Sequence, residues 1–243
     1  MQPNVYVTEH EISQTVCRHF AEGCSGKLVS PTHLRPGPAV VYGLLRGCGD
    51  IVRACDWVGR TFFHVDNGYF RPGHYEGYYR VTENAFQKPP EGVFPSDRWE
   101  RVGTDLRPWR RDGKFILIVP PSPFVAAWQG IDIPRWVATV HDEIQRYTDR
   151  QVRVKPEKGR MDEALRNCWT VVTHNSMAAC HALREGVPVI TLDPDHVAGP
   201  VSWDFPDIDQ PWWPEREPWA HGVAYQQWTL DEFASGEAWD VFE

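Results

Sequence analysis

Four consecutive polar residues follow an apolar run and precede an alanine-rich segment in the second half of the chain. They are Thr173, His174, Asn175 and Ser176. The order strand, turn and helix leaves the first N–H groups of the helix unpaired, and such groups bind phosphate or carboxylate. Asn175 and Ser176 are also favourable N-caps, so capping alone is an alternative. Because one cap residue would suffice, we predict an anion site at this turn.

A second polar group ends an apolar strand in the first half, where "FFHVDNGYF" places His64, Asp66 and Asn67 before Gly68. A carboxylate at the end of a strand can act as a general base and accept the proton of an attacking hydroxyl. We predict Asp66 as this base and His64 as its substitute. The alternative is an Asx-turn, in which Asp66 bonds only to the nearby backbone.

Aromatic and basic residues near these positions could bind the molecule that carries the attacking hydroxyl, which we call the acceptor. Tyrosine rings beside a guanidinium suit a sugar or a base, although they suit the edge of a core as well. Arg46, in "YGLLRGCGD", could hold an anion at the start of a helix or could lie in a plain tight turn. The predicted acceptor-binding residues are Arg46, Tyr69, Tyr79 and Arg80.

The elements that must position these residues alternate between strands and helices. Strands are expected at "NVYVT", "PAVVYGLL", "TFFHVDNG", "KFILIVPP", "QVRVKP", "WTVVTH" and "VPVITLD". The strands of the second half are too apolar to have one face in water, which is typical of a parallel sheet covered by helices on both faces. The sequence therefore predicts an α/β fold with two Rossmann-like lobes facing a cleft, where ligands bind beyond the carboxyl ends of the strands.

Composition changes along the chain suggest where these lobes begin and end. The region from about residue 87 to 114 is rich in proline and charge, and six of the 12 tryptophans lie in the last fifty residues or so. We expect an N-terminal lobe at 1–95, a linker at 96–114 and a C-terminal lobe at 115–200. A Trp-rich acidic extension at 201–243 is expected to pack back on the lobes.

The bulk composition excludes several classes of protein. A hydrophobic content of 42% excludes a disordered chain. No run approaches the 18 apolar residues of a membrane span, and the start lacks the features of a signal peptide, so we expect a cytoplasmic protein. The six cysteines include no CxxC pair and fit no zinc pattern. We expect them to be buried thiols.

The net charge of −8 is unevenly distributed. From residue 193 onward the chain has 12 acids and one base, whereas the preceding residues have 24 bases and 21 acids. A mildly basic body could bind a polyanion, but no basic arm is present. The charge distribution therefore does not identify a binding partner.

The strand, the "THNS" turn, the alanine-rich helix and "REGVPVI" resemble the C-terminal lobe of GT-B glycosyltransferases and capsule-polysaccharide enzymes, over residues 115 to 192 approximately. The resemblance implies a nucleotide-diphosphate sugar donor, with a UDP-sugar expected, and no motif demands a divalent metal. Many members have a ribose-binding Glu five residues before the glycine, where this chain has His181. The donor-binding residues that the resemblance implies are Ser122, Lys155, Thr173, His174, Asn175, Ser176, His181 and Glu185.

A second resemblance extends over both halves. The segments "HVDNGYF", "YYRVTENAFQ", "IVPPSP", "VVTHNS" and "QWTLDEFASGEAW" are similar to proteins of tailed phages that are associated with modified-DNA chemistry. This resemblance implies an inverting glycosyltransferase acting on a 5-hydroxymethyl pyrimidine in phage DNA, with the target base flipped out of the duplex, in the cytoplasm of an infected bacterium. The alternatives are a sugar transferase acting on a small molecule or surface polysaccharide, and a non-catalytic nucleotide-binding protein.

Overall fold

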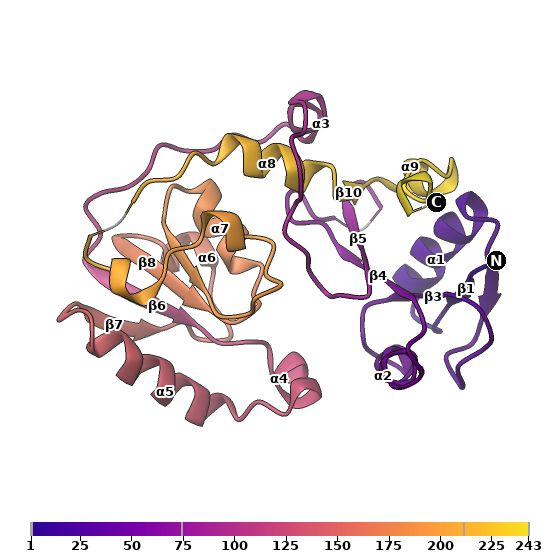
Figure 1. Cartoon of the computed structure of the whole chain (residues 1–243), viewed down its shortest axis with the longest axis horizontal. Coiled ribbons are helices and arrows are strands. Elements are labelled where there is room, and N and C mark those ends of the chain that lie inside the picture. Colours follow the sequence, from indigo (N-terminus) through magenta and orange to yellow (C-terminus); the bar gives the residue numbers. More distant parts are fainter. Residues whose placement is uncertain (1, 74, 211, 243) are drawn as a thin grey trace. The chain divides into compact units, whose positions relative to one another are not determined.

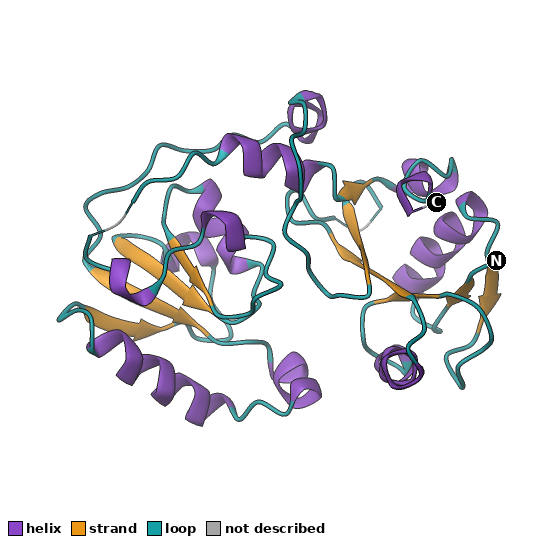
Figure 2. Cartoon of the chain, viewed as in Figure 1, coloured by secondary structure: helices purple, strands orange, loops and turns teal. Residues whose placement is uncertain are grey.

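The alternation of strands and helices produces an α/β fold in each of two units, which confirms the α/β part of the predicted fold class (Figures 1 and 2). The structure is a computed structural model that describes residues 2–73, 75–210 and 212–242. Unit 1 comprises Met1–Lys88 and Val223–Glu243, and unit 2 comprises Pro89–Gly222. This division differs from the expected one, because 96–114 lies wholly within unit 2 and 201–243 is shared between the units.

The sheet of unit 1 combines parallel strands with an antiparallel edge. Its order is β10-β5-β4-β3-β1-β2, and β5 and β10 are the antiparallel members. The strands are β1 (Asn4–Tyr6), β2 (Lys27–Val29), β3 (Ala39–Tyr42), β4 (Phe62–Asn67), β5 (Tyr79–Glu83) and β10 (Gln227–Trp228). The region of β5 is not among the strands expected from the sequence. It pairs with β4 and buries Tyr79 and Val81 in the core.

Helices cover both faces of this sheet. They are α1 (Glu11–Gly23), α2 (Cys48–Val58) and α9 (Leu230–Ala234), with a 3-10 turn η3 (Asp240–Phe242). The connections through α1 and α2 run in opposite directions along the sheet, so right-handed crossovers put these helices on opposite faces. On the α1 face, Phe20 meets Phe233 of α9 edge to face, with ring centroids 5.1 Å apart. The C-terminal residues thereby complete the core of unit 1.

The sheet of unit 2 contains the four parallel strands that the sequence predicts. Its order is β7-β6-β8-β9. The strands are β6 (Phe115–Val119), β7 (Gln151–Val154), β8 (Cys168–Thr173) and β9 (Val189–Thr191). Every residue of β6 and β8 is buried, as expected for central strands between two helical layers.

In unit 2, α5 covers one face of the sheet and α6 and α7 cover the other (Figure 1). The helices are α3 (Asp97–Val102), α4 (Pro123–Gln129), α5 (Ile133–Gln145), α6 (Met161–Ala164) and α7 (Ala178–Arg184), with the 3-10 turns η1 (Gly199–Val201) and η2 (Phe205–Asp207). A final helix, α8 (Glu217–Ala224), carries the chain from unit 2 back to unit 1.

Buried tryptophans after residue 200 belong to the cores of both units, whereas Trp212 is exposed. Trp203 is buried against Ile116, Ile118 and the residues of α5, whereas Trp228 belongs to the core around α1. All six cysteines are buried, as predicted. Within the described residues, no helix has the length and apolar character needed to cross a membrane.

Candidate functional site

The strand order of unit 2 creates a point where two neighbouring loops diverge. From β6 the chain moves to β7 on one side, whereas from β8 it moves to β9 on the other. Loops that leave adjacent parallel strands in opposite directions open a crevice at the carboxyl edge of the sheet, where α/β proteins bind ligands. The loop after β6 contains Ser122, and the loop after β8 contains His174, Asn175 and Ser176.

The turn of residues 174–176, which we call the β8 turn, is partly exposed and is held by several hydrogen bonds. The Asn175 side chain donates to Gln129 at the end of α4, over 3.2 Å. The Ser176 hydroxyl accepts from the Ala178 N–H over 3.2 Å, and the carbonyl of His174 accepts from the Asp193 N–H over 3.2 Å. The Ser176 hydroxyl therefore bonds to the first residue of α7, whose N-cap is Met177, while its proton can still be donated to a ligand.

Thr173 and Ser122 have structural roles beside this turn. Thr173 is completely buried, and its hydroxyl donates to the carbonyl of Val119 over 2.8 Å, which ties the ends of β8 and β6 together. The Ser122 hydroxyl accepts from the Val125 N–H and caps α4. Donor binding by Thr173 and Ser122 stays a prediction, and the burial of Thr173 weighs against direct contact with a ligand.

Lys155 lies at the end of β7, as predicted. Its backbone N–H donates to the carbonyl of Ile118, and its ammonium donates to the carbonyl of the next residue, Pro156, over 3.0 Å. A side chain held by a single exposed carbonyl can be redirected at low cost. Lys155 therefore places a positive charge on the β7 side of the carboxyl edge.

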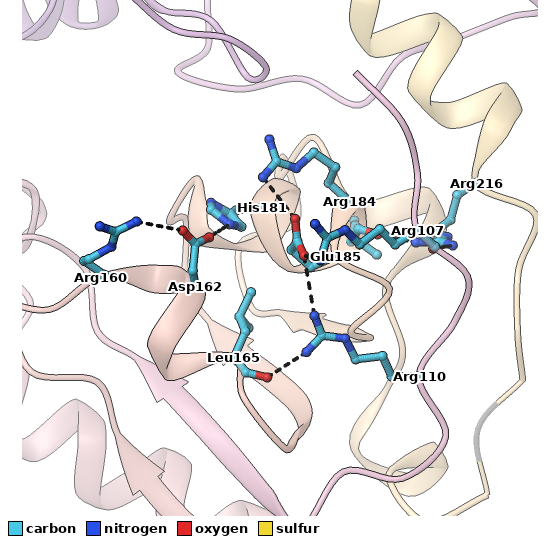
Figure 3. Close-up of polar contacts among 10 residues, drawn as sticks. Arg107, Arg110, Arg160, Asp162, Leu165, His181, Arg184, Glu185 and Arg216 are labelled. Carbon is cyan, nitrogen blue, oxygen red and sulfur yellow. Dashed lines mark hydrogen bonds and ion pairs between the residues drawn. The ribbon is translucent and has the colours of Figure 1, made fainter. Parts of the chain in front are cut away.

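Glu185 lies at the far end of α7 from the β8 turn, so these two predicted donor elements are separated. Figure 3 shows Glu185 beside Arg107, Arg110 and Arg184. Its carboxylate is buried and pairs with Arg107 over 2.8 Å, Arg184 over 3.0 Å and Arg110 over 3.5 Å. This carboxylate neutralises the surrounding guanidinium groups, which would otherwise repel one another. We call these four residues the Glu185 cluster. Donor binding by Glu185 stays a prediction.

The Glu185 cluster fastens the segment before β6 to the end of α7. The N–H of Arg107 donates to the carbonyl of Arg184 over 2.8 Å, and the N–H of Arg110 donates to that of Gly186 over 2.7 Å. Gly186 has a φ of +76°, and a Cβ there would collide with the carbonyl of Pro108. This attachment explains why residues 96–114 belong to unit 2.

His181 also uses its side chain within the protein (Figure 3). Its Nε2 lies 2.7 Å from Oδ1 of Asp162 in α6, and Arg160 lies 3.4 Å from the other carboxylate oxygen. The hydrogen bond and charge of His181, together with Arg160, lower the pKa of Asp162. Helix α6 thus supplies a carboxylate, that of Asp162, beside His181. Asp162 is not among the residues predicted from the sequence.

In unit 1, the predicted base Asp66 forms an ion pair with the predicted acceptor residue Arg80. These residues are directly opposite in the register of β4 and β5, and the Arg80 Nη2 lies 2.8 Å from Oδ2 of Asp66. Arg80 also donates to the carbonyl of Asn67, and the Asn67 N–H donates to Asp66. Burial raises the pKa of Asp66, but Arg80, His64 and the Asn67 N–H together hold it below its usual value.

His64 lies on the same face of β4 as Asp66 and is almost completely buried. The ring of Phe86 meets its imidazole edge to face, with centroids 5.1 Å apart. Burial lowers the pKa of His64 to about 4, although the charge of Asp66 opposes the shift. His64 is therefore neutral near pH 7, and its burial limits its access to a substrate.

The other predicted acceptor residues are not all exposed. Arg46 is exposed and has a φ of +55° in the loop that leads into α2. Tyr69 is buried beneath the guanidinium of Arg80, 5.0 Å from its ring centroid, and Tyr79 is completely buried. Acceptor binding by these residues stays a prediction, which the burial of Tyr79 weakens. Gln227 of β10 was not identified from the sequence. Its side-chain oxygen accepts from the Phe70 N–H, and its side-chain nitrogen donates to the Phe70 carbonyl.

No group of three or more His, Cys, Asp or Glu side chains that could hold a metal ion occurs among the described residues. The expectation that no divalent metal is needed rests on the sequence and stays untested.

Comparison with protein families finds no match, and comparison with curated proteins finds no relative. Among solved structures, the chain is similar to the Thermosulfurimonas dismutans KpsC beta Kdo 2,7 transferase, with a TM-score of 0.50 and 10% identity over 100% of both chains. The KpsC beta Kdo 2,4 transferase of the same organism has a TM-score of 0.48 and 9% identity over 93% of this chain and 91% of that one. At 10% identity, the likeness to the 2,7 transferase shows a shared fold alone.

Proposed function

We propose that the chain is a glycosyltransferase that binds a nucleotide sugar at the carboxyl edge of unit 2 and transfers the sugar to a hydroxyl group. The observation that carries this proposal is the polar β8 turn at the divergence of β6 and β8, in a chain with the fold of a KpsC beta Kdo 2,7 transferase over its whole length. The carboxyl edge of such a sheet is the usual place for a phosphate-bearing ligand.

The chemistry of the β8 turn suits the phosphate of a donor. The imidazole of His174, the amide of Asn175 and the hydroxyl of Ser176 can all donate hydrogen bonds to phosphate oxygens. Lys155 adds a positive charge at the end of β7 when its ammonium leaves the Pro156 carbonyl. These groups do not read a nucleobase, so the expected UDP-sugar is one of several nucleotide sugars that they could bind.

The proposed reaction needs a base for the acceptor. The acceptor oxygen bonds to the anomeric carbon, the bond from that carbon to the phosphate oxygen breaks, and its electron pair leaves with the phosphate. We assign the acceptor proton to the carboxylate of Asp66, in an inverting transfer. The ion pair with Arg80 keeps Asp66 ionised and also weakens it as a base, so this assignment needs the direct test given below.

The proposed acceptor is the hydroxyl of a saccharide or another small molecule. The folds that resemble this chain belong to Kdo transferases, which favours a saccharide. A duplex DNA acceptor has less support, because the acidic C-terminal residues belong to both units and neither unit has an excess of bases. Unit 1 has 9 bases and 13 acids and unit 2 has 16 bases and 20 acids, a net charge of −4 each. Binding the phosphates of a duplex favours an excess of positive charge.

The test has two stages. Thermal shift with the nucleoside mono- and diphosphates that carry sugars identifies the nucleotide, and mass spectrometry then follows transfer from the matching nucleotide sugars. The acceptors are bacterial capsule oligosaccharides and hydroxymethylated duplex DNA. Transfer to saccharide supports the proposal. Transfer to DNA alone would indicate that the acceptor is the 5-hydroxymethyl pyrimidine in DNA that the phage resemblance implies. Nucleotide binding without transfer to either acceptor indicates a non-catalytic nucleotide-binding protein, and absence of nucleotide binding overturns the proposal.

A further inference from the structure

The loop after β9 holds a histidine whose two ring nitrogens make different hydrogen bonds. His196 is completely buried. Its Nδ1 accepts from the Ala198 N–H over 3.0 Å, and its Nε2 lies 3.2 Å from the carbonyl oxygen of Ser176 in the β8 turn. One imidazole therefore joins the loop after β9 to the turn after β8.

These two bonds determine where the proton of the neutral ring lies. A nitrogen that accepts a hydrogen bond carries no proton, so Nδ1 is bare and Nε2 carries the proton. The Nε2–H consequently donates to the carbonyl of Ser176, which also accepts the Ala179 N–H over 3.1 Å. The first turn of α7 and the side chain of His196 therefore share one hydrogen-bond acceptor, the carbonyl oxygen of Ser176.

The loop that carries His196 is itself firmly held. The N–H of His196 donates to the carbonyl of Asp193 over 3.1 Å, and the carboxylate of Asp193 accepts from the Asp195 N–H over 3.1 Å. The N–H of Asp193 in turn donates to the carbonyl of His174. The loop after β9 therefore holds the β8 turn at both ends, through the backbone carbonyls of His174 and Ser176.

We propose that His196 is a positioning residue of the donor site, which fixes the Ser176 carbonyl so that His174, Asn175 and Ser176 are arranged for a phosphate before the donor arrives. The proposal rests on the proposed function. Hydrogen-bond donors that are already arranged cost less to order when the ligand binds. The nucleotide affinity therefore depends on one hydrogen bond from a side chain that does not touch the donor.

Two substitutions separate the two bonds of His196. In His196→Gln the side-chain amide nitrogen reaches about as far as Nε2 and can still donate to Ser176, but the acceptor for Ala198 is lost. In His196→Asn the side-chain carbonyl takes the place of Nδ1 and still accepts from Ala198, but the donor to Ser176 is lost. Both variants remove an imidazole from a buried position, so each controls for the loss of packing in the other.

The first measurement needs no ligand. Amide hydrogen exchange, followed by mass spectrometry of peptides covering residues 174–184, reports how firmly the β8 turn and α7 are held. We expect faster exchange at Ala178 and Ala179 in His196→Asn and near wild-type exchange in His196→Gln. Equal exchange in both variants, with similar melting temperatures, would show that the bond to Ser176 does not hold the turn and would overturn the proposal.

The second measurement is calorimetric titration with UDP, CMP and the other nucleoside mono- and diphosphates. For any nucleotide that the wild type binds, the affinity should fall about tenfold in His196→Asn, the scale of one lost hydrogen bond, and only a few-fold in His196→Gln. Equal affinities in the two variants overturn the positioning role and leave the proposed function standing. If the wild type binds no nucleotide, both proposals fail, and the exchange data still report separately whether His196 holds the turn.

Discussion

Asp66 and Arg80 face each other across β4 and β5, with a carboxylate oxygen 2.8 Å from a guanidinium nitrogen. The Arg80 side chain is 6% exposed and that of Asp66 is 34% exposed, so the pair lies at the boundary between the core of unit 1 and solvent. Arg80 also holds the carbonyl of Asn67, which fixes the end of β4. This ion pair therefore stabilises the end of β4 and also contains the proposed base, Asp66.

Replacing Asp66 with Asn should destabilise the protein, because the buried charge of Arg80 loses its partner. We expect a loss of about 1–3 kcal/mol, less than for a fully buried pair since the carboxylate is partly exposed. Urea unfolding at pH 7 measures the difference. Asp50→Asn is the matched control, because the Asp50–Arg53 pair is exposed and 3.9 Å long and should contribute less than about 0.5 kcal/mol.

The stability gap between wild type and Asp66→Asn should depend on pH in a defined direction. The folded pKa of Asp66 is lowered, so its contribution is present in full above its unfolded pKa of about 3.9. That contribution is lost as the pH falls through the folded pKa. Unfolding curves from pH 7 to pH 2 should therefore converge below about pH 4. A gap that stays constant to pH 2 would contradict the lowered pKa.

The same Asp66→Asn variant tests the assignment of the base. Asparagine cannot accept the proton, so turnover should fall by about 10²–10⁴-fold while nucleotide affinity in unit 2 stays within a few-fold. Rates and titrations on one folded sample measure both effects. Full activity would remove Asp66 from the mechanism, since asparagine serves a turn as well as aspartate does.

The β8 turn can be tested by truncation. His174→Ala and Ser176→Ala should each weaken nucleotide binding about tenfold, because each removes a hydrogen-bond donor. Ser176→Ala should also cost about 1 kcal/mol of stability, because the Ala178 N–H loses its hydrogen bond to the Ser176 hydroxyl. Thr229→Ala, which removes the cap of α9 in unit 1, should cost a similar amount without changing the affinity. Unchanged affinity in both turn variants would remove this turn from the donor site.

Glu185→Gln should unfold the protein more easily rather than weaken donor binding. Its carboxylate is buried among three guanidinium groups, and its removal should cost about 2–4 kcal/mol, somewhat reduced because Arg107 is largely exposed. Glu143→Gln, which breaks the surface pair with Arg146, should cost less than about 1 kcal/mol. Chemical unfolding compares the two. A more than tenfold loss of nucleotide affinity in a folded Glu185→Gln sample would show that this carboxylate contacts the donor.

The strands and helices of unit 2 were predictable because their signals are local. Buried runs such as "KFILIVPP" and "WTVVTH" cannot place one face in water, so they specify central parallel strands. The same strands specify where the β8 turn lies, because a parallel strand that is followed by a helix ends at the ligand-binding edge. The position of Asp66 at the end of β4 was predictable for the same reason.

In unit 1, local signals identified three strands but were insufficient for β5 and β10. The segment of β5 follows a stretch rich in tyrosine and glycine, which is typical of a loop, and pairing with β4 decided its conformation. β10 contains only Gln227 and Trp228, and it joins β5 from the other end of the chain. A strand of two residues has no periodicity, so the sequence alone could not identify it.

The sequence by itself determined the α/β class, the parallel sheet of unit 2 and the polar turn at its carboxyl edge, because burial and turn formation depend on neighbouring residues. Only the tertiary structure decided what those polar residues contact. It paired Asp66 with Arg80, placed Glu185 among three arginines and brought His196 to Ser176, twenty residues away. Such partners meet through strand register and loop packing, and a hydrogen bond between distant residues leaves no periodic signal in the sequence.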